Sequence, residues 1–81
     1  MSMLDNYLHA AMQRAQYQIA DDESIVATIA EFENVSACGE TLEACQQELM
    51  EALEERVFFH LARGLPLPTI AGIAGPRPRI Y

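Results

Sequence analysis

The chain has 81 residues, half of them apolar, and a formal net charge of −7. This length allows one domain with a modest core, and so much apolar surface on a small body predicts an interface with another subunit. The acidic balance, with five Arg and no Lys, argues against direct nucleic-acid binding, which depends on basic side chains that neutralise phosphates.

The chain is expected to begin with a helix over residues 3–14. Apolar residues recur there at helical spacing and make one stripe, which consists of Leu4, Leu8, Ala11, Met12 and Ala15. Asp5 in the first turn and Arg14 in the last complement the helix dipole.

From residue 15 the period of the apolar pattern changes to two, which predicts strands. Residues 15–20 and 24–32 predict an antiparallel hairpin around the acidic turn Asp21-Asp22-Glu23. The second strand is apolar on both faces, which is typical of a central strand or of one that meets a partner. Glu33-Asn34 predicts a turn, and residues 35–38 predict a short third strand.

A long helix follows, with recognisable signals at both ends. Thr41 is a good N-cap, and the helix is expected to run to Arg63, where Gly64 can adopt the left-handed C′ conformation. The stripe expected to face the sheet is Leu42, Cys45, Leu49, Ala52, Leu53 and Val57. These elements predict an α+β fold of α-β-β-β-α order, with the long helix packed across a three-stranded antiparallel sheet.

The outward side of this helix is the candidate partner-binding surface. Val57, Phe58 and Phe59 are consecutive and point about 100° apart, so at least one Phe is expected to be exposed or covered by a second chain. An acidic surface can also steer a basic partner towards it, although the charge can equally serve solubility. The candidate binding residues are Glu43, Glu51, Glu54, Glu55, Phe58 and Phe59.

The remaining features set the boundaries and the compartment. Residues 65–70 are expected to be extended because of their prolines, so the domain covers residues 1–70 and residues 71–81 form a flexible tail. No signal peptide or membrane-spanning run is evident, so a cytoplasmic protein is expected. Cys38 and Cys45 are expected to be free thiols, buried or half-buried.

No catalytic residue, cofactor site or metal site is predicted. His9 and His60 each fall on a helix, where a surface or packing role is more common than metal ligation. The alternative is an enzyme, a metal-dependent nuclease or phosphotransfer protein whose Mg²⁺ would be held by Asp21, Asp22, Glu23 and Glu31. Acidic residues in a hairpin turn are more often simply its polar surface.

The order of features from residue 17 to residue 72 resembles the HicB-like antitoxin domain. The matching segments are Tyr17-Gln-Ile, the strand Ser24 to Phe32, the stretch from Val35 to Cys45, the helix end Arg63-Gly64, and Leu67-Pro68. The chain departs from the family pattern at three positions, with Ala30 for Pro, Asn34 for Gly and Glu40 for Asp. Gly39 is still expected to allow a tight turn, and Thr41 to cap the helix.

The resemblance implies a partial ribonuclease-H-like fold without that enzyme's catalytic carboxylates. It also implies a homodimer or homotetramer that occludes a small, basic, RNA-cleaving HicA-like toxin. Many such antitoxins carry a C-terminal DNA-binding segment, which is not seen in this sequence. An orphan regulatory protein of the same fold, with no toxin, is the alternative within the family.

Overall fold

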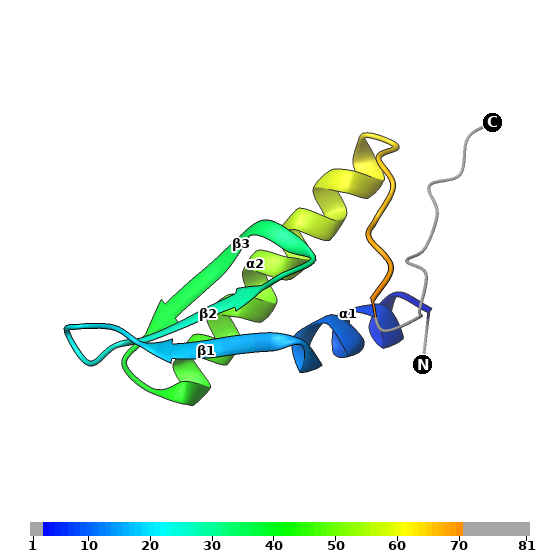
Figure 1. Ribbon diagram of the computed structural model, residues 1–81. Helices are drawn as coiled ribbons and strands as arrows, with labels where there is room; N and C mark the ends of the chain where they lie inside the picture. The colour runs from blue at the N-terminus through cyan, green and yellow to red at the C-terminus, as the bar shows by residue number, and fades with distance from the viewer. Residues whose placement is uncertain (1–2, 71–81) are drawn as a thin grey trace.

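The computed structural model describes residues 3–70, so the predicted flexible tail over 71–81 lies outside the described residues. Five elements follow one another along the chain (Figure 1): α1 (Met3–Gln13), β1 (Ala15–Ile19), β2 (Ile25–Ile29), β3 (Phe32–Gly39) and α2 (Leu42–Ala62). The α+β class and the α-β-β-β-α order predicted from the sequence are confirmed.

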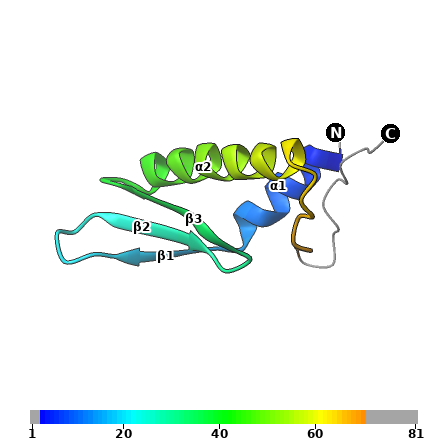
Figure 2. The same cartoon turned by 90° about the horizontal axis from the view of Figure 1, so that it is seen from above.

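The three strands form one antiparallel sheet in the order β1-β2-β3, so β2 is the central strand, as its apolar pattern predicted. Helix α2 packs mainly on β3 and less on β2, and β1 lies farthest from it (Figure 2). No helix within residues 3–70 covers the opposite face of the sheet. This uncovered face carries Val26 and otherwise small or polar side chains: Gln16, Gln18, Thr28, Ser36 and Cys38.

The core lies between α2 and the covered face of the sheet. Four residues of the predicted α2 stripe are fully buried: Cys45, Leu49, Leu53 and Val57. They meet Ala27 and Ile29 of β2 and Phe32 and Val35 of β3. Burial of each large aliphatic or aromatic side chain contributes about 1.5–3 kcal/mol, so this stripe holds α2 on the sheet. Leu42, which was predicted to face the sheet, is 46% exposed because it stands at the first residue of the helix, at the edge of the layer.

Helix α1 and the extended segment after α2 close one end of the core. Tyr7 is fully buried, its ring lies edge-on to Phe32 at 6.4 Å, and its hydroxyl donates a hydrogen bond to the Pro68 carbonyl. Ile70 is also fully buried. The segment that returns from the end of α2 therefore runs towards α1 (Figure 1) and packs into the core.

Both ends of α2 have the chemistry that the sequence predicted. The Thr41 hydroxyl oxygen accepts a hydrogen bond from the Ala44 amide at 3.1 Å. At the other end Gly64 has a φ of +69°, and the Leu65 amide donates to the His60 carbonyl at 2.8 Å. The side-chain cap and the left-handed glycine satisfy backbone groups that the helix itself cannot pair.

The turn between β2 and β3 was predicted at the wrong residues. It consists of Ala30 and Glu31, and β3 begins at Phe32 rather than after Glu33-Asn34. Glu31 forms an ion pair with Arg14 at the end of α1, and Phe32 is only 5% exposed. A register shift between Thr28 and Ile29 lets the chain turn early and place the Phe32 ring in the core.

Gly39 ends β3, and the chain reaches α2 after only Glu40 and Thr41, so the connection is short, as predicted. Among the described glycines only Gly64 has a positive φ. A Cβ on Gly39 would instead lie 2.7 Å from the backbone nitrogen of Cys45. The missing side chain allows the first turn of α2 to lie directly on the end of β3.

Candidate protein-binding site

The predicted glutamates lie on the side of α2 that faces away from the sheet. Glu43, Glu51 and Glu55 are exposed and Glu54 is half-buried. Glu48, which was not among the predicted residues, is exposed on the same side. No described residue forms an ion pair with any of these five carboxylates, which therefore form an unneutralised acidic face.

The last turns of α2 carry a cluster of aromatic and basic side chains. Phe58 is 58% exposed and Phe59 is 40% exposed, which confirms that Val57, Phe58 and Phe59 cannot share one core. The guanidinium carbons of Arg56 and Arg63 lie 5.2 Å and 4.6 Å from the centre of the Phe59 ring. Each such cation–π contact contributes about 0.5–1 kcal/mol at an exposed site, so the three side chains hold one another in place.

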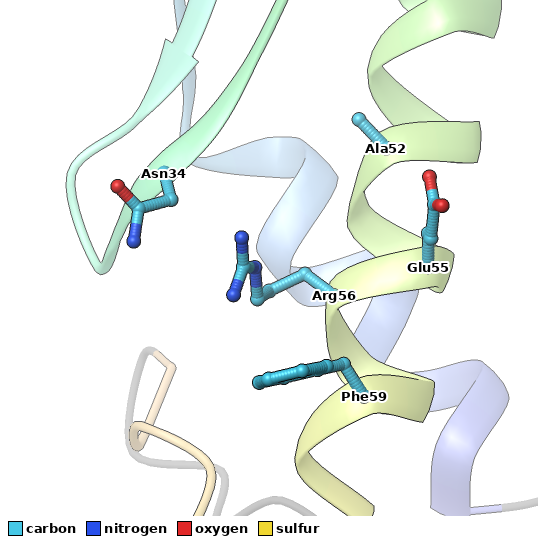
Figure 3. Close-up of a pocket in the computed structure, with 5 residues that line it drawn as sticks. All are labelled: Asn34, Ala52, Glu55, Arg56 and Phe59. Atoms are coloured by element: carbon cyan, nitrogen blue, oxygen red, sulfur yellow. The ribbon is translucent and has the colours of Figure 1, made fainter.

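A shallow groove of about 320 Å³ runs between α2 and the start of β3 (Figure 3). It is lined by Asn34, Ala52, Glu55, Arg56 and Phe59. The Arg56 guanidinium extends from α2 towards the Asn34 amide, and the Phe59 ring lies below it. The groove thus offers two side chains that can donate hydrogen bonds, Asn34 and Arg56, beside an aromatic face. This combination suits a carbonyl or carboxylate of a partner protein.

The structure brings together only some of the predicted binding residues. Glu55 and Phe59 line the same groove, whereas Phe58 does not line it and Glu43 belongs to the first turn of α2. Sequence reasoning missed four residues: Asn34, Glu48, Arg56 and Arg63. The spacing of Arg56, Phe59 and Arg63 by three and four residues does place them on one face of a helix, so this part of the cluster could have been found.

The four acidic residues of the enzyme alternative do not come together. Asp21, Asp22 and Glu23 form the turn before β2, whereas Glu31 follows β2 and pairs with Arg14. A five-residue strand, about 16 Å long, separates the two ends. Hydrogen bonds from the Ser24 hydroxyl and amide, at 2.6 Å and 3.1 Å, lower the pKa of Asp22. Residues 3–70 contain no group of three or more His, Cys, Asp or Glu placed to hold a metal ion.

The histidine and cysteine side chains have packing or surface positions. The His60 ring lies 6.4 Å from the Phe32 ring, and its Nδ1 is 3.1 Å from the Pro66 carbonyl oxygen. Cys45 is buried, and this burial raises the pKa of its thiol. The electrostatic effect of Cys38 acts in the same direction and is smaller. Cys38 is exposed on the uncovered face of the sheet, contrary to the expectation that both thiols would be at least half-buried.

Comparison with known proteins identifies the family. The UPF0150-like family profile matches residues 6–68, which include all five elements except the start of α1. The chain belongs to the UPF0150-like family. A similar solved structure is the crystal structure of TTHA0281 from Thermus thermophilus, with 34% sequence identity and a TM-score of 0.91, covering 98% of this chain and 99% of the other.

A search of the curated proteins found no match for this UPF0150-like protein. None of the helices within residues 3–70 is long and apolar enough to cross a membrane.

Proposed function

We propose that this UPF0150-like protein is a HicB-like antitoxin module, which binds a small, basic, RNA-cleaving toxin of the HicA type and blocks its active surface. It acts by protein contact and performs no chemical step. The observation that carries the proposal is the unneutralised acidic face of α2, formed by Glu43, Glu48, Glu51, Glu54 and Glu55.

The distribution of charge along α2 supports a basic partner. From Leu42 to Glu55 the helix carries five Glu and no Lys or Arg. The negative electrostatic potential of these glutamates raises the local concentration of a basic protein and speeds its association. The chain's net charge of −7 repels nucleic acid. A toxin that grips RNA with basic side chains presents the complementary surface.

The groove at the end of the acidic face supplies the short-range part of the contact. Steering by exposed charges contributes mostly to the association rate, whereas buried aromatic and Arg contacts dominate the affinity of protein interfaces. Phe59 and Arg56 in the groove, with Phe58 beside them on the last turns, provide such contacts within reach of Glu55.

The family relation supports the same proposal. The UPF0150-like family is associated with small HicB-like antitoxins, and the ordered segments from Tyr17 to Gly72 resemble the HicB-like domain. A HicA-like toxin from the same genome is therefore the first partner to test.

The test compares association rates of the parent with those of the Glu51→Gln/Glu55→Gln double variant. Exposed helix positions tolerate such changes within about 0.5 kcal/mol, so the fold should survive. Stopped-flow mixing with the toxin should show severalfold slower association at low salt. The difference should shrink as salt rises, because the Debye length falls to about 10 Å at 0.1 M ionic strength.

The matched control is the Asp21→Asn/Glu23→Gln double variant. It changes the net charge by the same amount at two exposed positions outside α2. If it slows association as much as the α2 variant does, only the net charge matters and the α2 face is not the docking surface. If neither variant differs from the parent at low salt, the recognition surface must be sought on the uncovered face of the sheet.

A further inference from the structure

Within residues 3–70, no strand pairs with the outer edge of β1. β1 is the first strand in the order β1-β2-β3, and its four residues from Gln16 to Ile19 are exposed. The Ala20 amide donates to the Ser24 carbonyl at 2.8 Å, which fixes the alternation of the antiparallel ladder. With this register, the backbone groups of Gln16 and Gln18 point towards β2, and those of Ala15, Tyr17 and Ile19 point outward to the open edge.

This edge lacks the features that usually prevent strands from pairing. Exposed edge strands commonly carry charged residues, proline or a bulge, which disfavour contact with another strand. The sequence of β1 is Ala-Gln-Tyr-Gln-Ile, with no charge and no proline, in a chain whose net charge is −7. Its pairing with β2 continues without a register shift. β1 is thus a neutral, regular edge on an acidic protein.

Apolar side chains accompany the open backbone. Tyr17 pairs with Ala27 in the sheet and therefore lies on the face that α2 covers farther along. Because α2 packs on β3 and β2, Tyr17 stays 36% exposed and Ile19 78% exposed. The apolar side of the core thus extends beyond α2 as a strip formed by Tyr17 and Ile19, with no described element over it.

We infer that β1 pairs with β1 of a second copy of this chain, antiparallel about a two-fold axis at Tyr17, to make one continuous six-stranded sheet. A two-fold interface requires a surface that is complementary to itself. The strand meets this requirement, because pairing Tyr17 with its equivalent sets Ala15 opposite Ile19 on one face and Gln16 opposite Gln18 on the other. The same register brings together the outward backbone groups of Ala15, Tyr17 and Ile19.

Charge complementarity favours a second copy over another partner. In this register Arg14 of one copy lies opposite Ala20 of the other, next to its acidic turn of Asp21, Asp22 and Glu23. Arg14 is 46% exposed although it already forms an ion pair with Glu31 of its own chain. The contact occurs twice by symmetry, so the two acidic chains meet with each acidic turn beside an Arg.

The expected dimer is weak and independent of toxin binding. One five-residue strand pair and a strip of two apolar side chains bury less than standard interfaces, so a dissociation constant on the order of micromolar is expected. The α2 face and its groove remain free in this arrangement. The inference goes beyond the proposed antitoxin function, since it concerns the chain without any partner.

The first experiment measures sedimentation velocity of the wild-type chain and two variants over a range of concentrations. Ile19→Lys places a charge in the apolar strip, and Phe58→Lys is the matched control, a large exposed side chain at the end of α2. The wild type and Phe58→Lys should form dimers with similar dissociation constants, and Ile19→Lys should stay monomeric. A dimer lost only in Phe58→Lys, or a monomeric wild type, would overturn the inference.

The second experiment needs no variant and guards against misfolding of Ile19→Lys. Amide hydrogen exchange is measured on the wild type at low and high concentration. The Tyr17 and Ile19 amides should exchange rapidly when dilute and become protected when concentrated, while the Gln18 amide, directed at β2, should stay protected throughout. Tyr17 and Ile19 amides that exchange rapidly in a concentrated dimer, or that gain protection only with toxin, would overturn the self-pairing.

Discussion

Replacement of Gly39 by Ala tests the contact between α2 and β3 directly. The added Cβ would stand 2.7 Å from the Cys45 nitrogen and 3.1 Å from the Ala44 carbonyl carbon, whereas ordinary contacts begin at 3.4 Å. These atoms belong to the backbone and have no rotamer to change, so the first turn of α2 must move off the sheet. Overpacking of this kind costs about 1–3 kcal/mol. That is a large share of the roughly 5 kcal/mol expected for so small a domain.

Gly64 provides the matched comparison, because glycine is needed there for the backbone conformation and not for lack of space. It has a φ of +69° with open space around the position of a Cβ, so Gly64→Ala should cost about 1–2 kcal/mol through backbone strain alone. Asn tolerates the left-handed region, so Gly64→Asn should cost less than Gly64→Ala. At position 39 we expect the opposite: Gly39→Asn should lower the free energy of unfolding at least as much as Gly39→Ala does.

Urea denaturation followed by circular dichroism gives the free energy of unfolding of all four variants. The close approach of α2 to Gly39 is refuted if the free energy of unfolding of Gly39→Ala stays within about 0.5 kcal/mol of the parent's, the range of neutral surface changes. It is also refuted if Asn restores stability at position 39. That result would place Gly39 in a left-handed conformation, which Asn tolerates better than Ala does.

Two further predictions concern the N-terminal cap of α2 and the buried Tyr7. Thr41→Ala should lower the free energy of unfolding by about 0.5–2 kcal/mol in urea denaturation and Thr41→Ser by much less, because the hydroxyl caps the Ala44 amide; equal losses would mean that the hydroxyl is not the cap. Burial, with a smaller effect of Glu31, raises the pKa of Tyr7 to about 12 from 10.0. The folded state therefore holds its proton where the unfolded state releases it, and thermal stability should fall between about pH 10 and 12. Tyr7→Phe should be less stable at neutral pH and should lack this part of the alkaline loss; an unchanged alkaline profile would assign the loss to other groups.

The parts of the fold that depend on local chemistry could be predicted from the sequence. Thr41 and Gly64 mark the ends of α2 because a side-chain cap and a left-handed glycine act on neighbouring backbone groups. The period-two pattern likewise located β1 and β2, and the consecutive Phe58 and Phe59 correctly predicted an exposed aromatic side chain.

The errors arise where distant residues decide the outcome. Glu33-Asn34 has good turn residues, but the turn forms earlier because Glu31 pairs with Arg14 and Phe32 enters the core. Tyr7 lies outside the predicted stripe of α1 and is buried by the segment around Pro68, sixty-one residues away. Such long-range contacts leave no periodic signal in the sequence.

In the candidate site, too, the features set by local sequence could be predicted and those set by packing could not. The acidic face of α2 follows from helical spacing, and four of its five glutamates were predicted, whereas Glu48 was missed. The groove could not, since Asn34 comes from β3 and meets Arg56 only after α2 has packed on the sheet. The open edge of β1 also depends on packing, because it results from the position of α2 over β2 and β3.

The different exposure of the two thiols allows local opening of α2 to be measured by chemical modification. Cys38 is exposed, whereas Cys45 is buried at the start of α2 with its sulfur 3.8 Å from the Ala37 carbonyl oxygen. An alkylating reagent will modify the first thiol in the native state and the second only during moments when the first turns of α2 lift away. The rate of the second modification, read by mass, therefore measures the free energy of that opening without any added label.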